Sequence, residues 1–175
     1  ELGGKSPCII DDSVNVDLVA RRLVWGKFLN AGQTCVSPDY LIVHPNIKQE
    51  LITALKNQII KAYGEDQEQS PDFPRIINER NLSRLMEMIA DSNIVYGGKV
   101  NKDENFLSAT LIDEPSLDSE VMKDEIFGPV LPILSYVNEK DIENIIWSFE
   151  KPLSLYVFSN RKTFIEQILN KYSFG

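Results

Sequence analysis

The sequence predicts an α/β fold, with an open, twisted and largely parallel sheet flanked by helices. Short apolar runs alternate along the chain with segments whose apolar residues recur every three or four positions, as in one-sided helices. Glycine, proline and asparagine separate these segments. The length of 175 residues suits one buried core. Alternating strands and helices favour parallel pairing with right-handed crossovers.

The first part of the chain predicts two strand–helix units. Residues 7–10 are a compact apolar run typical of a buried strand, and Asp12 or Ser13 is a candidate cap for the next helix. Residues 41–43 predict the second strand. The two helices carry apolar stripes at Val16, Val19, Ala20 and Leu23, and at Ile47, Leu51, Leu55 and Ile59.

Turn residues limit these elements. Asn30 and Gly32 are stop signals for the first helix, Pro45 ends the second strand, and Gly64 is a candidate C-terminal cap for the second helix. The polar segment 64–74 contains two prolines and predicts a surface loop.

The rest of the chain continues the alternation. We expect helices around residues 82–89, 142–149 and 164–169, strands at 109–112, 130–134 and 154–158, and a turn at 97–98. Pro132 lies inside the second of these strands. Because proline has no N–H to donate to a ladder, it predicts an edge strand or a strand end there.

Composition excludes several classes of function. The formal net charge is -8, whereas nucleic-acid binding requires clustered Lys and Arg. No apolar run approaches the length needed to cross a bilayer. The two cysteines, Cys8 and Cys35, form no CxxC pair, which favours a reducing, cytoplasmic setting. The single histidine, His44, excludes a His-rich metal site.

Glu1 and Cys35 are a candidate catalytic pair. A strand over residues 5–11 would run roughly 23 Å outward at about 3.3 Å per residue, and a helix over 14–30 would return roughly 25 Å at 1.5 Å per residue. The two paths nearly cancel, so both residues are expected at one end of the strand–helix unit. Gly3, Gly4 and Gly32 allow close backbone approach there.

The chemistry of the two side chains suits such a pair. An ordinary cysteine, with a pKa near 8.5, is only about 3% thiolate at pH 7, so it needs an acceptor for its proton or a positive local field. A carboxylate within reach, directly or through one water, can serve as the base.

Three segments resemble signatures of the aldehyde dehydrogenase catalytic domain. They are Glu-Leu-Gly-Gly-Lys-Ser-Pro at 1–7, Gly-Gln-Thr-Cys at 32–35 and Glu-Ile-Phe-Gly-Pro-Val-Leu-Pro at 125–132. The resemblance extends over essentially the whole chain. Segments 25–28, 63–66 and 150–153 are most similar to the class 3 branch, whose members take fatty or aromatic aldehydes.

The resemblance implies a role for each site residue. Cys35 would attack the aldehyde carbon, and its backbone N–H would be one oxyanion donor. Glu1 would activate the water that releases the acid. NAD or NADP would accept the hydride. The residues implied to lie against this cofactor are Leu2, Gly3, Glu125 and Phe127.

The resemblance also implies that residues 1–175 are a single catalytic domain, truncated at both ends. The N-terminal dinucleotide-binding half, with the second oxyanion donor, and the C-terminal oligomerisation segment would be missing. The expected partners of this chain are therefore a small-molecule aldehyde and the missing N-terminal half. The parent enzyme is expected to be a homodimer. Losing one oxyanion donor can cost roughly 3–4 kcal/mol of barrier, so the isolated chain is expected to be nearly inactive.

The sequence also leaves alternative functions open. A CoA-acylating relative would pass the acyl group to a thiol rather than to water, although Glu1 argues against it. The chain could also be a non-catalytic folding or assembly module. A Cys35–His44 dyad would suit a thiol hydrolase, but no motif supports it. Cys8 is expected to be structural because it lies in an apolar strand, and Lys5 because Gly4-Lys5-Ser6 cannot complete a phosphate-binding loop.

Overall fold

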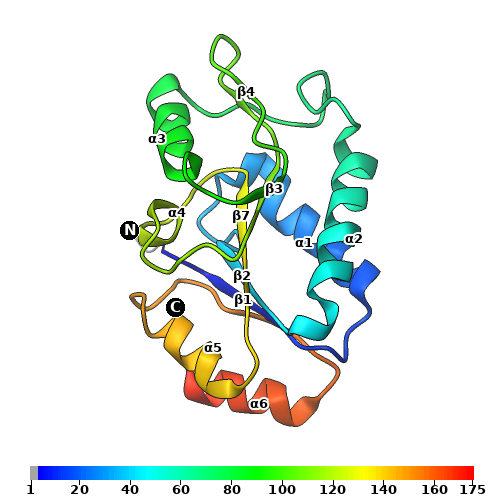
Figure 1. Cartoon of the computed structure of the whole chain (residues 1–175), viewed down its shortest axis with the longest axis vertical. Coiled ribbons are helices and arrows are strands. Elements are labelled where there is room, and N and C mark those ends of the chain that lie inside the picture. The colour runs from blue at the N-terminus through cyan, green and yellow to red at the C-terminus, as the bar shows by residue number, and fades with distance from the viewer. Residues whose placement is uncertain (1–3) are drawn as a thin grey trace.

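The computed structural model describes residues 4–175 and shows a six-stranded sheet with helices packed around it (Figure 1). The strand order is β3-β6-β7-β2-β1-β8. Only β3 and β6 pair antiparallel; the other neighbours are parallel. The predicted α/β class with a largely parallel sheet is therefore confirmed. The strands of the sheet are β1 (Pro7–Ile10), β2 (Tyr40–Val43), β3 (Ile94–Tyr96), β6 (Thr110–Asp113), β7 (Val130–Ser135) and β8 (Tyr156–Phe158).

Six helices surround the sheet within the described part of the chain. In Figure 1, α1 and α2 lie on one side of the strands and α3 and α4 on the other. Lys171 on α6 forms an ion pair with Glu143 on α5 at 3.6 Å, so these two helices lie side by side. The helices are α1 (Val16–Phe28), α2 (Pro45–Tyr63), α3 (Glu79–Ile89), α4 (Glu120–Lys123), α5 (Glu139–Ile146) and α6 (Lys162–Lys171).

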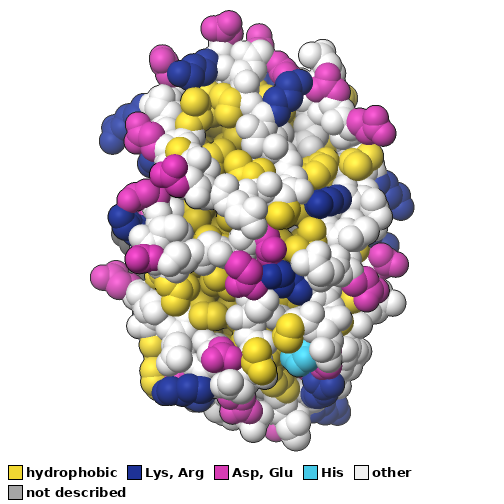
Figure 2. Space-filling model, viewed as in Figure 1, with side chains coloured by type: hydrophobic (Ala, Val, Ile, Leu, Met, Phe, Trp, Pro, Cys, Tyr) yellow, Lys and Arg dark blue, Asp and Glu magenta, His cyan; other side chains and the backbone are white. Residues whose placement is uncertain are grey.

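The core is built from the apolar stripes that the sequence predicts. Strands β1 and β2 are buried at every position, and Leu51, Leu55 and Ile59 of α2 are fully buried in the same core. Burial of such side chains contributes about 1.5–3 kcal/mol each. Charged side chains of both signs are interspersed over the face shown in Figure 2. Among residues 4–175, no helix is long and apolar enough to cross a membrane.

Several local predictions need correction. The cap of α1 is Asn15, whose side chain accepts a hydrogen bond from the Leu18 N–H, and not Asp12 or Ser13. The helix predicted over 142–149 ends at Ile146. The sequence did not predict four short elements, which are β3, α4 and the two strands of a ribbon, β4 (Val100–Asn101) and β5 (Phe106–Leu107). They are too short for periodicity to identify.

The prediction that Pro132 marks an edge strand or a strand end is wrong. Pro132 lies within β7, an interior strand between β6 and β2. Its registered partner is Ile112 on β6, whereas pairing with β2 begins one residue later, at Ile133. The missing N–H therefore falls where β2 has not yet joined the ladder, and an interior strand tolerates it.

Candidate functional site

The three signature segments meet at one edge of the sheet. Each comes directly before a parallel strand: residues 4–6 before β1, 32–39 before β2 and 124–129 before β7. Pro7 is in register with Tyr40, and Leu41 with Ile133, so these strands start at nearly the same level. The loops before them consequently gather at the amino-terminal edge of the sheet.

A buried ion pair joins the segments. The Lys5 ammonium lies 2.6 Å from Asp39 Oδ2 and also donates to the carbonyls of Val121 and Asp124, at 3.1 and 3.0 Å. Asp39 Oδ1 accepts a hydrogen bond from the Ile126 N–H at 3.1 Å. Asp39 thus connects Lys5 of the first signature to Ile126 of the third. The structural role predicted for Lys5 is confirmed.

A second lysine approaches the same carboxylate. Lys27 near the end of α1 is fully buried, and its Nζ lies 3.9 Å from Asp39 Oδ1 without a hydrogen bond to any group among residues 4–175. The pKa of Lys27 is lowered to about 8, chiefly by desolvation and to a smaller extent by the charge of Lys5, while the charges of Asp39 and Glu125 oppose the shift. A buried ammonium therefore faces both Asp39 and the third signature segment.

Two glycines bring the second and third segments into backbone contact. A Cβ placed on Gly32 would lie 2.2 Å from the Gly128 carbonyl oxygen, and Gly32 has a φ of +71°. Gly128 in turn faces the Leu85 side chain, only 2.6 Å from where its own Cβ would stand. Only glycine permits this approach, which fixes the thiol loop against the segment that carries Glu125 and Phe127.

Cys35 lies on a turn at the surface. The turn spans residues 34–37 and is closed by a 2.9 Å hydrogen bond from the Ser37 N–H to the Thr34 carbonyl. Cys35 is exposed, whereas Ser37, two residues later, is buried. No carbonyl among residues 4–175 accepts a hydrogen bond from the Cys35 N–H. Cys35 is therefore accessible to an incoming molecule, and its N–H is not used in the backbone hydrogen bonding of residues 4–175.

Glu125 and Phe127 lie on the neighbouring segment. Phe127 has a φ of +46° and is 40% exposed. Glu125 is partly exposed. Arg84 on α3 donates to the Ile126 carbonyl at 2.6 Å and to the Glu125 carbonyl at 3.4 Å, so α3 holds the backbone of this segment.

Glu1, Leu2 and Gly3 lie outside the described residues, so their predicted roles stay predictions. The ion pair between Lys5 and Asp39 tests whether the two ends of the strand–helix unit come together. Lys5 follows Glu1 by four positions and Asp39 follows Cys35 by four, and these two residues are ion-paired. The strand–helix unit therefore brings its two ends together, as the length argument expects.

The two alternative residues behave differently from Cys35. Cys8 is fully buried in β1, and burial raises the pKa of its thiol, so its predicted packing role is confirmed. His44 follows the end of β2, whereas Cys35 precedes its start. The His44 side chain caps α2 and faces Asp12 at 3.8 Å. A Cys35–His44 dyad would need both residues at one end of β2, so the thiol-hydrolase alternative is wrong.

An apolar pocket of about 320 Å³ opens beside the thiol loop. Thr34 and Val36, the two neighbours of Cys35, both line it. Trp25 on α1, which is 69% exposed, forms part of its wall, and Tyr156 and Phe158 line it from the edge strand β8. An exposed thiol next to an apolar hollow is suited to binding a small electrophile with an apolar tail.

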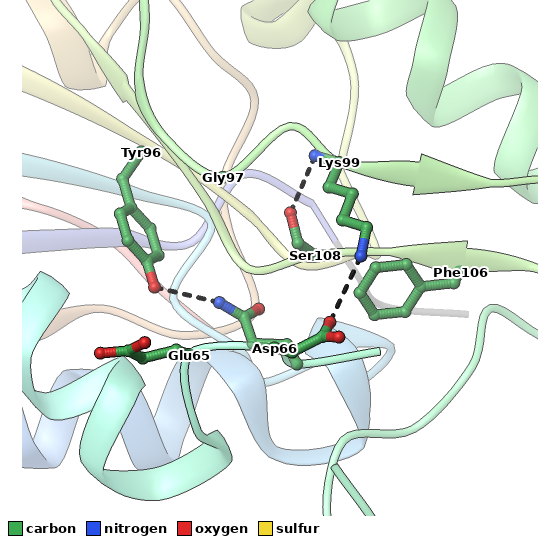
Figure 3. A pocket seen from close by; sticks show the side chains of 8 residues that line it. Glu65, Asp66, Tyr96, Gly97, Lys99, Phe106 and Ser108 are labelled. Carbon is green, nitrogen blue, oxygen red and sulfur yellow. Dashed lines mark hydrogen bonds and ion pairs between the residues drawn. The ribbon is translucent and has the colours of Figure 1, made fainter. Parts of the chain in front are cut away.

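A second pocket, of about 380 Å³, lies toward the opposite edge of the sheet, near β3 and β6 (Figure 3). Several of its polar groups are bonded to neighbouring polar groups. Lys99 pairs with Asp66 at 3.3 Å and with Glu68 at 2.8 Å, and the Gln67 amide donates to the Tyr96 hydroxyl at 3.1 Å. Among its described lining residues, we find no nucleophile comparable to Cys35.

Sequence reasoning missed several residues that build the site. Asp39, Lys27, Arg84 and Gln33 received no role, although Gln33 lies within the Gly-Gln-Thr-Cys segment. Its carboxamide bonds to the backbone of Arg75 and Ile77. The motif that contains Gln33 was its only signal in the sequence. Asp39, Lys27 and Arg84 had none, because their roles depend on tertiary contacts.

Comparison with known proteins identifies the family. The model of the "Aldehyde dehydrogenase family" matches residues 1–175. The chain is 45% identical to the 4,4'-diaponeurosporen-aldehyde dehydrogenase of Staphylococcus aureus, and 41% identical to the dimeric NADP-preferring aldehyde dehydrogenase of Mus musculus. Both matches cover 100% of this chain and 39% of the relative. The chain thus spans about two fifths of the length of these relatives.

Solved structures agree with the sequence matches. The substrate-bound state of Staphylococcus aureus AldH superposes with a TM-score of 0.95 at 43% identity, over 99% of this chain and 38% of that one. An Escherichia coli NADP-dependent enzyme gives 0.90 at 26% identity, over 100% of this chain and 38% of that one. The predicted similarity to class 3 enzymes is confirmed, and the chain belongs to the aldehyde dehydrogenase family.

Proposed function

We propose that this chain supplies the nucleophile and part of the cofactor contacts of an enzyme that oxidises aldehydes to carboxylic acids. The observation that carries the proposal is the exposed Cys35, held on a turn whose two flanking residues line an apolar pocket. The contrast with Cys8, which is sealed in the core, argues that the exposure of Cys35 is a built feature.

The proposed reaction uses the chain's own groups in sequence. The Cys35 thiolate attacks the carbonyl carbon, and the Cys35 N–H donates to the oxygen as it gains charge. Loss of hydride from the resulting thiohemiacetal leaves a thioester on the sulfur. Glu1 takes a proton from the water that attacks this thioester, which releases the acid and restores the thiolate. The apolar pocket beside Cys35 favours aldehydes with fatty or aromatic tails.

The residues present fit a nicotinamide cofactor. The exposed Phe127 ring and the partly exposed Glu125 stand on the segment that abuts the thiol loop through Gly32 and Gly128. Phe127 would pack beside the nicotinamide and Glu125 would hold its ribose hydroxyls, with Leu2 and Gly3 close to the ring. When bound, NAD or NADP supplies the hydride acceptor. The buried Lys5–Asp39 pair keeps this segment in place beside the thiol.

The proposal concerns the parent enzyme, which would contain the remaining three fifths of the relatives' length. We expect residues 1–175 alone to show almost no dehydrogenase activity, because part of the cofactor site and one oxyanion donor would be missing. Robust turnover by this chain with NAD or NADP and an aldehyde would contradict that expectation.

The test is replacement of Cys35 by alanine in the parent enzyme. We expect loss of aldehyde-dependent NAD(P)H formation with unchanged folding, and Cys8→Ala is the matched control that keeps activity. Full activity of Cys35→Ala would refute the proposal. Adding CoA separates the acylating alternative, because an acyl-CoA product would show that a thiol, not water activated by Glu1, resolves the thioester.

A further inference from the structure

The residues just before the thiol turn adopt an unusual backbone. Asn30, Ala31 and Gly32 follow one another with φ values of +54°, +51° and +71°. L-residues other than glycine rarely adopt this left-handed conformation, so their surroundings must hold Asn30 and Ala31 in it. This left-handed turn comes three positions before Cys35.

The side chain of Gln33 closes the left-handed turn. Its Nε2 donates to the Asn30 carbonyl at 3.1 Å, and its backbone N–H donates to the same oxygen at 3.1 Å. Asn30 returns the contact, because its Nδ2 donates to the Gln33 carbonyl at 3.0 Å. Gln33 and Asn30 therefore bind each other through both backbone and side chain.

The same carboxamide ties the turn to a distant segment. Gln33 Nε2 also donates to the Arg75 carbonyl at 3.1 Å, and Gln33 Oε1 accepts from the Ile77 N–H at 3.0 Å. This segment leads into α3, which holds the third signature segment through Arg84. After Cys35, the chain is fixed separately by the Tyr156 hydroxyl, which donates to the Val36 carbonyl.

We propose that Gln33 is a positioning residue for the Cys35 nucleophile, because its carboxamide locks the left-handed turn onto residues 75–77. The inference rests on the proposed function of Cys35. Gln33 does not enter the hydrophobic core, so its loss would free the thiol loop and leave the sheet intact. The thiol would then spend less time in the attacking geometry.

Gln67 provides a matched control. It also bridges two segments through its carboxamide, accepting from the Ala109 N–H at 2.7 Å and donating to the Tyr96 hydroxyl at 3.1 Å. It lies in the pocket of Figure 3, toward the other edge of the sheet. Gln33→Met and Gln67→Met each remove one bridging carboxamide and keep the side-chain length.

The experiment compares these two variants of the parent enzyme. Because displacement of a reacting group by about 1 Å can cost roughly a hundredfold in rate, we expect Gln33→Met to lower kcat by about ten- to a hundredfold while the KM for aldehyde changes little. Gln67→Met should retain kcat per folded molecule. Equal losses of kcat in both variants, or an unchanged kcat in Gln33→Met, would overturn the inference.

Hydrogen exchange tests the lock without relying on activity. In Gln33→Met, protection should fall at the Ile77 amide and over residues 30–37, while β1, β2 and β7 stay protected. Unchanged exchange over residues 30–37 would overturn the lock even if no aldehyde is oxidised, so its failure is distinct from failure of the proposed function. If Gln33→Met does not fold, the milder Gln33→Asn keeps a carboxamide that is one methylene too short to span both partners, and the same readouts apply.

Discussion

The apolar pocket beside the thiol loop and the polar pocket of Figure 3 have similar volumes, about 320 and 380 Å³. The regions around them are also built in a similar way. Both regions contain a glutamine that bridges two segments and a glycine at positive φ close to a backbone carbonyl. These are Gln33 and Gly32 in the loop before Cys35, and Gln67 and Gly97 in the lining of the second pocket. The two regions differ in whether a reactive group is exposed. In the second pocket Lys99 is paired with Asp66, and Gln67 with Tyr96, whereas the exposed Cys35 lies between two residues that line the first. An available reactive atom, rather than cavity size, distinguishes the candidate site.

The largest expected difference is in thiol reactivity. Cys35 is exposed, while Cys8 must wait for local or global opening and has a raised pKa. For a domain stable by about 5 kcal/mol, iodoacetamide should label Cys35 roughly a thousandfold faster than Cys8 near neutral pH. Mass spectrometry of the two cysteine peptides over time measures the ratio, and comparable rates would place Cys35 in the inert class with Cys8.

The next largest effect separates a buried ion pair from an exposed one. Asp39→Asn removes the carboxylate that faces the buried ammonium groups of Lys5 and Lys27, which should destabilise the fold by about 3–5 kcal/mol. Asp66→Asn in the second pocket removes a pair in which both side chains are more than half exposed, and should leave stability nearly unchanged. Urea unfolding of both variants checks this; similar losses would mean that burial does not separate the two pairs.

The two glycines offer a sharper comparison. A Cβ on Gly32 would lie 2.2 Å from a carbonyl oxygen, and one on Gly97 would lie 2.0 Å from another. Alanine at either position should destabilise the fold by at least about 1–2 kcal/mol from the left-handed backbone alone. Only Gly32→Ala should also reduce kcat of the parent enzyme, because it displaces the thiol loop. Loss of kcat in Gly97→Ala, measured per folded molecule, would contradict the separation of the two regions.

The smallest predicted effect is a pH dependence of stability. The folded pKa of Lys27, about 8, lies below its unfolded value near 10.4, so the unfolded chain binds more protons between these limits. Stability contributed by this group should therefore rise with pH above about 8. Lys27→Met should remove that rise, which urea titrations between about pH 7.5 and 9.5 would show. Parallel pH profiles for the two proteins would argue against a buried, partly neutral Lys27.

The sequence predicted elements with a strong period and missed features set by tertiary contact. The stripe from Ile47 to Ile59 is sufficient to place α2, because four-residue spacing needs no other part of the chain. Neither the Lys5–Asp39 pair nor the interior place of Pro132 has a local signature, since each depends on strands that are distant in sequence. For the candidate site, the motifs predicted roles for Cys35, Glu125 and Phe127. They assigned no role to Gln33, whose partners Arg75 and Ile77 lie more than 40 residues away.

The chemistry-bearing loops all precede the parallel strands, which has a practical consequence. The loops that follow β1, β2 and β8 carry caps and ion pairs such as Arg161 with Asp11 and Asp12, and none of them contributes to the thiol pocket. A fluorescent label or an affinity tether could therefore be attached along that far rim without covering the pocket proposed to receive the aldehyde.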